Sequence, residues 1–333
     1  MKETILQAPN STNVPIARPP VAPRCLAPIP VSERDLPFTI AEPYFKVADT
    51  PFALEGPAFD RHGNLLFVDI YGGRVLRLTP ELALDTVFAE PGLNPAGIAV
   101  HRDGRLFVAA CGARNASGHF DAGSVIAVAP DGSRRHTILA PEAGYVPNDL
   151  VFDPQGGLYM SDFRGTSTLA LGGVYYFPPE LNAMAPVLPG LCMANGVALS
   201  PDGKVLWSTE FGAGRLHRAE LRAPGALAQS GSSVPYHFVG PGADSMRTDS
   251  EGNVYVAMNR QGRILIFSPY GIPIGQIHLP GRENNHFLRC TSLALMPDSC
   301  DLLIVARDEV GGGGTMIFKA QGLAPGFPLF SHQ

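Results

Sequence analysis

Four side chains that carry oxygen ligands recur along this chain at intervals of 93, 47 and 49 residues: Glu55, Asn148, Asn195 and Asp244. Each stands at the start of a short apolar stretch, where a charged or amide side chain is unexpected and calls for an explanation. Carboxylate and amide oxygens are the ligands that hard divalent cations such as calcium prefer. The two carboxylates would neutralise one such ion, the two amides would add neutral ligands, and Ser245 would offer a further oxygen. No His or Cys stands among them, which argues against zinc or copper.

The elements that must position these side chains form an internal repeat. Six segments read as a strand, a polar turn and a second apolar strand, as in EGPAFDRHGNLLFVDI and NGVALSPDGKVLWST, and most turns carry Asp-Gly, Gln-Gly or Glu-Gly. A third strand, such as GRVLRLTP or GRILIFSP, follows closely. A period of 41 to 52 residues with about four strands per unit predicts an all-β, six-bladed β-propeller with four-stranded antiparallel blades. The first residues of the six units, called the ring positions below, are Glu55, Ala96, Asn148, Asn195, Asp244 and Thr291.

The ring positions are predicted to meet at one end of the central channel, because the innermost strand of each blade lines it. A single Asn or Asp at a strand end often bonds only its own backbone. Four oxygen-bearing side chains among six positions around one axis indicate a ligand site instead. Buried carboxylates without a cation would be costly, so a cation would explain the charge of Glu55.

The ring also needs a closing strand. The stretch YFKVA, residues 44–48, resembles TVFAE, which reads as the outer strand of a blade, whereas the sixth unit ends near Ala320 without a fourth strand. We therefore predict that residues 44–48 complete the sixth blade. Residues 1–40 are expected to form a Pro-rich arm, flexible or draped over the surface, and residues 41–333 a single propeller domain.

Composition excludes several classes of protein. The net charge is −5 and no Lys/Arg cluster occurs, so a nucleic-acid partner is not expected. No apolar run is long enough to span a membrane, and the N-terminus lacks an apolar signal core. Five scattered cysteines without a C-x-x-C pair indicate reduced thiols in a cytoplasmic protein. The absence of G-x-S-x-G and H-E-x-x-H motifs argues against a serine hydrolase and a zinc protease.

Several segments carry a resemblance to a known family. EGPAFDRHGNLLFVDI, NGVALSPDGKVLWSTE and ADSMRTDSEGNVYVAM resemble the gluconolactonase/senescence-marker-protein (regucalcin-like) family of six-bladed propellers. GRILIFSPYGIPIGQIHLPGRENNHFLRCTSLAL and ARDEVGGGGTMIFKAQGLAPG look like its drug-responsive, calcium-dependent lactonase branch. The resemblance spans residues 51–326 and implies lactone hydrolysis at a divalent metal, usually calcium, although manganese and magnesium accept the same oxygen ligands. The implied metal ligands are Glu55, Asn148, Asn195, Asp244 and Ser245, with Asp244 in proton transfer and Asn148 beside it at the catalytic centre.

Two departures from the family pattern shape the expected chemistry. The lactonase branch often carries Asp at the position of Asn148, which leaves Asp244 as the main candidate for the base and Asp149 as a weaker one. Sugar-lactone members carry Arg at the position of Val146, so an apolar aryl, alkyl or terpenoid lactone is expected here rather than a sugar lactone. A second, structural calcium of the branch would lie near Asp121, Gly123 and Glu142, where the local match is poor and the question stays open.

Three functions remain open at this point. The first is a metal-dependent lactonase acting on a small-molecule lactone or ester, the second another metal-dependent ester or phosphotriester hydrolase, and the third a non-catalytic binding propeller. The sequence leaves the oligomeric state undetermined. If the loops at the channel mouth form the substrate pocket, its residues would be Phe52, Tyr145, Val146, Met193, Met246, His286 and Phe287.

Overall fold

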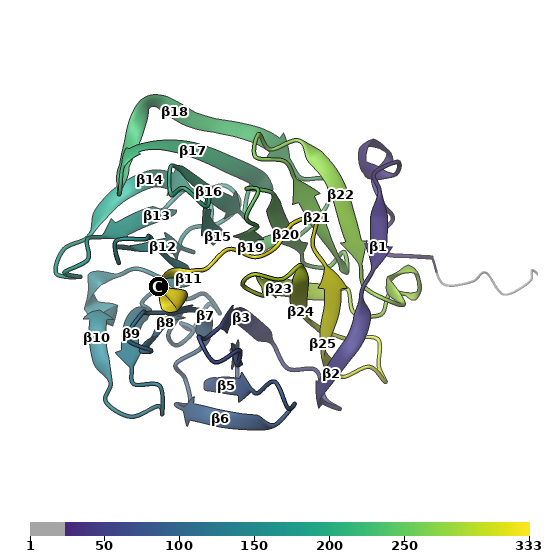
Figure 1. Cartoon of the computed structure of the whole chain (residues 1–333), viewed down its shortest axis with the longest axis horizontal. Helices are drawn as coiled ribbons and strands as arrows, with labels where there is room; N and C mark the ends of the chain where they lie inside the picture. The colour runs from purple at the N-terminus through teal and green to yellow at the C-terminus, as the bar shows by residue number, and fades with distance from the viewer. Residues whose placement is uncertain (1–23) are drawn as a thin grey trace, which may run out of the picture.

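The computed structural model describes residues 24–333, which fold into six β-sheets arranged around a central axis (Figure 1). Five sheets have four strands, and the sheet of blade five has a fifth strand at its outer edge. Each innermost strand contacts the innermost strand of the next blade, and β23 (Arg289–Leu295) contacts β3 (Leu54–Phe59), which completes the circle. The prediction of an all-β, six-bladed propeller with four-stranded antiparallel blades is confirmed.

The strands follow one another from the axis outward in every blade. Blade one contains β3, β4 (Leu65–Asp69), β5 (Arg74–Leu78) and β6 (Leu84–Ala89), and blade two contains β7 (Pro95–Val100), β8 (Leu106–Ala110), β9 (Ser124–Val128) and β10 (His136–Leu139). Blade three contains β11 (Pro147–Phe152), β12 (Leu158–Asp162), β13 (Gly172–Phe177) and β14 (Ala185–Leu191). Blade four contains β15 (Ala194–Leu199), β16 (Val205–Glu210), β17 (Arg215–Ala223) and β18 (Ala226–His237). Blade five contains β19 (Ala243–Thr248), β20 (Val254–Met258), β21 (Arg263–Phe267) and β22 (Pro273–His278), and blade six contains β23, β24 (Asp301–Arg307) and β25 (Thr315–Gln321).

Two N-terminal strands join the last two blades. β2 (Glu42–Ala48) pairs antiparallel with β25 as the outer strand of blade six, at the place expected for residues 44–48 (Figure 1). β1 (Phe38–Ile40) runs parallel to β22 on blade five, a pairing that the sequence pattern did not predict. Buried Glu33 forms an ion pair with buried Arg263 of β21. Residues 24–40 of the expected arm thus lie against blade five, and residues 1–23 fall outside the described residues.

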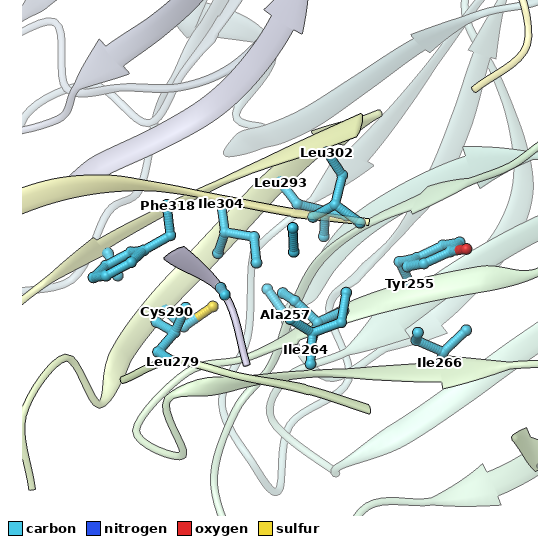
Figure 2. Packing of buried hydrophobic residues seen from close by; sticks show 14 of the residues in the cluster. Tyr255, Ala257, Ile264, Ile266, Leu279, Cys290, Leu293, Leu302, Ile304 and Phe318 are labelled. Carbon is cyan, nitrogen blue, oxygen red and sulfur yellow. The ribbon is translucent and has the colours of Figure 1, made fainter. Parts of the chain in front are cut away.

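Six apolar clusters hold the ring together, one between each pair of neighbouring blades. The second strand of a blade is buried on both faces, because every blade packs against two others. Figure 2 shows the cluster between blades five and six, where Ile264 meets Leu293 and Ile304. This packing fixes the innermost strands relative to one another, and these strands carry the ring positions.

Helical structure in residues 24–333 is confined to four 3-10 turns: η1 (Val31–Glu33), η2 (Pro141–Ala143), η3 (Arg282–Asn284) and η4 (Phe330–His332). No helix in this part of the chain is long and apolar enough to cross a membrane. All five cysteines are free thiols.

Candidate active site

A cavity of about 190 Å³ lies at one end of the channel, and all six ring positions line it. Each ring position is close to the first residue of an innermost strand, so the repeat in the sequence becomes a circle of side chains in the structure. Glu55, Asn195 and Asp244 are buried, and Asn148 is half-buried. The structure therefore gathers the four predicted oxygen-bearing side chains on one cavity.

A β-bulge re-aims the side chain at each ring position. In all six blades the register between the innermost strand and its neighbour shifts within the first residues, for example between Glu55 and Ala58 and between Ala243 and Met246. Such a shift breaks the alternation of side chains and turns one of them out of the sheet. In blade one the bulge requires a glycine, because Gly56 has φ +55° and a Cβ there would lie 2.7 Å from the Cα of Gly97.

The carboxylates of Glu55 and Asp244 are both buried, and their charges repel each other. Burial raises the pKa of the Asp244 carboxyl to about 7. Burial first and the charge of Asp244 second raise the pKa of Glu55 well above its ordinary value. Ser245 Oγ and the Gly56 N–H both donate to Glu55 Oε2, over 3.4 and 3.2 Å. A positive ion between the two carboxylates would relieve their repulsion and offset the loss of hydration that burial causes.

The hydrogen bonding of the amide oxygens indicates whether the cavity residues fit a metal ion. Asn195 Oδ1 and Asn259 Oδ1 are buried and have no hydrogen-bond partner. Both residues line the cavity beside Glu55 and Asp244, so two unpartnered amide oxygens stand with two carboxylates. Within residues 24–333 no cluster of three or more His, Cys, Asp or Glu side chains occurs. The channel set is instead two carboxylates with amides, a donor chemistry that fits calcium, manganese or magnesium.

Asn259, which the sequence analysis did not select, holds the Asp244 carboxylate. Its Nδ2 donates to Asp244 Oδ2 over 2.7 Å, and it directly follows β20, the second strand of blade five. This hydrogen bond keeps the carboxylate in one orientation. The side chain of Asn195 also donates to Asp244, and both hydrogen bonds oppose the effect of burial on its pKa.

Hydroxyl groups of neighbouring strands fix the backbone around the ring positions. Thr209 Oγ1 of β16 donates to the Asp244 carbonyl over 2.7 Å and accepts the Gly196 N–H over 2.7 Å, which ties blade four to blade five. Thr291 Oγ1 donates to the carbonyl of Leu54, the residue before Glu55, over 2.6 Å. Supporting hydrogen bonds of this kind orient metal-binding and catalytic side chains.

Asp149, the weaker candidate for the base, is committed elsewhere. It is fully buried, and Arg247 Nη1 donates to its Oδ2 over 2.8 Å. The Leu150 N–H donates to Asp149 Oδ1 over 2.9 Å. Asp149 is not on the cavity lining within the described residues. The geometry leaves Asp244 and Glu55 as the carboxylates that face the cavity.

The residues predicted for the substrate pocket lie near the cavity or in the cores, and none of them is on its lining within residues 24–333. Val146 and Met246 are fully buried. Val146 packs directly behind the lining, against Ala96, Cys111 and Phe120. Met246 belongs to the cluster between blades four and five. A bulge explains the place of Met246, because the register shift between Ala243 and Met246 turns this side chain, two residues after Asp244, away from the channel.

The other predicted pocket residues have surroundings of their own outside the cavity lining. Phe52 packs between blades six and one under the Arg74 guanidinium. The ring of Tyr145 meets Tyr175 edge-on. The remaining three are Met193, which has φ 58°, His286, which bonds Asp308 over 2.8 Å, and Phe287, which packs edge-on against Phe318.

A second circle of residues forms the wall that the sequence analysis missed. It comes from the ends of the second strands, one residue from each blade: Ile70, Cys111, Phe163, Phe211, Asn259 and Arg307. In the aligned repeats the first five of these residues directly follow FVD, VAA, MSD, STE and VAM, and Arg307 lies within VARD. The alignment of the six units could therefore have identified this second circle. Tyr71, Arg114, Phe120 and Arg289 complete most of the remaining wall.

The region considered for a second calcium shows ordinary loop contacts. Asp121 accepts a hydrogen bond from Asn115 Nδ2 over 2.7 Å, and the Gly123 N–H donates to the Tyr145 carbonyl over 2.6 Å. Glu142 lies in η2 and is exposed. These contacts do not bring the three residues together as a ligand set, and the question remains as the sequence left it.

A six-bladed ring with oxygen ligands at one end of its channel defines the class of protein: a propeller with a candidate site for a hard cation. The family model for the SMP-30/gluconolactonase/LRE-like region matches residues 54–305, and the chain belongs to this family. It is 42% identical over 305 residues to a protein named lactonase drp35 from Staphylococcus saprophyticus, covering 90% of this chain and 93% of the relative. The protein of the same name from Staphylococcus aureus strain MW2 is 41% identical over 307 residues, with 91% and 93% covered.

Solved structures share the fold at lower identity. A regucalcin from Agrobacterium tumefaciens, described as a calcium-binding protein, is 18% identical with a TM-score of 0.70, covering 88% of this chain and 99% of that one. A gluconolactonase from Xanthomonas campestris is 23% identical with a TM-score of 0.63, covering 83% and 88%. These structures support the six-bladed architecture.

Proposed function

We propose that this protein is a lactonase that uses one divalent cation, with calcium the first candidate, held in the channel cavity. The observation that carries the proposal is the meeting of two buried carboxylates with unpartnered amide oxygens on one cavity. The names of the curated relatives, lactonase drp35, support the reaction type. Glu55, Asn148, Asn195 and Asp244 would hold the cation, and Ser245 would contribute through its contact with Glu55.

The residues divide the work of hydrolysis in this proposal. A bound cation supplies Lewis acidity that polarises the lactone carbonyl and stabilises the oxyanion. Asp244 takes a proton from the attacking water and returns it to the alkoxide of the opening ring. Asn259 holds Asp244 Oδ2 by its 2.7 Å hydrogen bond, so the proton moves through a carboxylate with a fixed orientation. Asn148 lies on the same cavity wall, where its amide can contact the water or the substrate.

The wall of the cavity supports a substrate with an apolar body. Ile70, Tyr71, Phe120, Phe163 and Phe211 surround the ring positions. Aromatic walls bury flat or branched hydrocarbon groups well. An aryl, alkyl or terpenoid lactone therefore suits the site better than a polyhydroxylated sugar lactone, which would need many polar partners. The free thiols support a reducing compartment such as the cytoplasm.

The test is hydrolysis of dihydrocoumarin beside gluconolactone and a phosphotriester, with calcium and with a chelator. We expect turnover of dihydrocoumarin that the chelator abolishes and that calcium restores. Asp244→Asn should lower kcat by about 10²- to 10⁴-fold, the usual contribution of a general base. Asp202→Asn, on an exposed turn of blade four, is the matched control and should behave as wild type.

Each alternative result redirects the proposal. A preference for gluconolactone would keep the lactonase and reject the apolar substrate. Turnover of the phosphotriester alone would replace the lactonase by another hydrolase at the same site. Turnover that survives the chelator and Asp244→Asn would reject the site itself.

A further inference from the structure

Three guanidinium groups line the candidate active-site cavity: Arg114, Arg289 and Arg307. Arg289 and Arg307 share one carboxylate, that of Glu309, over 2.7 and 3.0 Å. Arg114 has no carboxylate within 4 Å among the described residues, and it is exposed at the open side of the cavity. The lining therefore carries more positive than negative groups, and one positive group is unpaired.

The Arg114 guanidinium is held in place although its charge is unpaired. It lies 4.2 Å above the centre of the Phe120 ring and 5.9 Å from that of Tyr71. One nitrogen donates to the Gly118 carbonyl over 2.5 Å and the other terminal nitrogen donates to the Tyr71 hydroxyl over 3.4 Å. A guanidinium has five N–H donors, so most of them remain for a ligand, in the fork that matches a carboxylate.

The position of Arg114 separates it from the carboxylates of the candidate metal site. Glu55 and Asp244 are buried at the deep side of the cavity, whereas Arg114 is exposed at its opening. Tyr71, Phe120 and Phe163 lie on the lining as well and offer apolar contact. A ligand with a hydrocarbon body and one anionic end would match both parts of the wall. A neutral hydrocarbon lactone would leave the donors of Arg114 to water.

We infer, on the basis of the proposed lactonase function, that the natural substrate is an apolar lactone that carries a carboxylate outside the lactone ring, and that Arg114 binds this carboxylate. Arg289 and Arg307 add positive potential at the same opening and favour the encounter with an anion. Arg114 is thus a specificity residue: it contacts the substrate far from the bond that is hydrolysed.

The test compares three substrates: dihydrocoumarin, a dihydrocoumarin with a carboxylate on its aromatic ring, and the carboxamide of the same shape. For the wild-type protein we expect kcat/KM to be about tenfold higher for the carboxylate than for the carboxamide, as a hydrogen bond between charged groups provides. The ratio should fall as sodium chloride is raised. Arg114→Gln should bring the ratio close to one through KM, and Arg114→Lys should restore part of it. Arg222→Gln, an exposed arginine of β17 away from the cavity, is the control and should keep the ratio.

Two outcomes would overturn this inference: equal kcat/KM for the carboxylate and the carboxamide in the wild type, or a preference that survives undiminished in Arg114→Gln. Thermal unfolding of Arg114→Gln with a midpoint near that of the wild type shows that the variant is folded. If dihydrocoumarin is not hydrolysed at all, the proposed function fails, and binding decides the inference separately. Calorimetry with para-ethylbenzoate should then show an affinity about tenfold lower in Arg114→Gln than in the wild type, and equal affinities would contradict the inference.

Discussion

The two ends of the channel are built from the same six strands and differ in chemistry. At the candidate active site the strands begin with bulges, and carboxylates and amides face a cavity of about 190 Å³. At the other end the same strands finish in apolar residues such as Val100, Phe152 and Leu199, around a cavity of about 60 Å³. The C-terminal segment, residues 322–333, covers this end and crosses the middle of the ring (Figure 1). One repeat has thus produced two different ends, which are called below the reactive end, after its proposed role, and the sealed end.

A buried ion pair separates the two ends. Asp149 follows the ring position Asn148 and pairs with Arg247, whose side chain reaches the apolar cavity. Phe330 of the C-terminal segment is 4% exposed and packs among the residues of blades two and three. Under the proposed function, the strand starts serve ligand binding, whereas the strand ends and the C-terminal segment serve stability. The predictions below test this division.

The largest effect is expected at the reactive end, from Glu55→Gln. The change keeps the shape of the side chain and removes one of two charges that would bind the cation. Activity on dihydrocoumarin should fall at least about a hundredfold, comparable to the loss of a single electrostatic stabiliser. In the presence of chelator the variant should be at least as stable as the wild type, because the repulsion with Asp244 is gone. A fully active Glu55→Gln variant would contradict the division of roles between the two ends of the channel.

At the sealed end, Phe330→Ala should affect stability and not calcium affinity. Removing this buried ring leaves a cavity against Phe152 and Phe107, and the free energy of unfolding should fall by about 3–5 kcal/mol. Phe38→Ala, at a position that is 58% exposed, is the control and should cost much less. Chemical denaturation and calcium titration of both variants give the measurement. Weakened calcium binding in Phe330→Ala would show that the two ends are coupled.

Asn259→Leu sharpens the account of the reactive end. It removes the hydrogen bond to Asp244 Oδ2 and an unpartnered amide oxygen while keeping a similar volume. We expect calcium affinity or kcat to fall by about 10- to 100-fold, as when a residue that orients a metal ligand is lost. Asn253→Leu is not a suitable control because that residue is buried and bonded to Asp249. Asn284→Leu, at an exposed position of η3, is suitable and should leave both quantities unchanged.

The smallest effect is expected from Thr209→Val, which removes one hydroxyl between blades four and five. The Gly196 N–H and the Asp244 carbonyl lose their shared partner, so the free energy of unfolding should drop by about 1–3 kcal/mol. The calcium affinity should fall as well, because the backbone of a ring position is released. A variant that loses stability at unchanged affinity would assign Thr209 to the fold alone.

The sequence was sufficient for the architecture because the repeat is visible in hydrophobic pattern and turn residues. The sequence also predicted that Glu55, Asn148, Asn195 and Asp244 lie close together, since equivalent strand positions must lie on one circle, and all four line one cavity. The wall of the cavity could not be inferred from nearby residues in the sequence, because a bulge can turn a side chain away from the channel, as it does for Met246, two residues after Asp244. The parallel pairing of β1 left no pattern in three residues, and the C-terminal segment has no repeat to place it.

Calcium titration of the wild-type protein and of Glu55→Gln by calorimetry tests the central claim most directly. The account predicts one calcium ion per chain in the wild type and binding that is abolished, or weakened about 100-fold or more, in the variant. A wild-type protein that binds no calcium, manganese or magnesium, or a Glu55→Gln variant that binds as the wild type does, would contradict the assignment of the cavity as a metal-dependent active site.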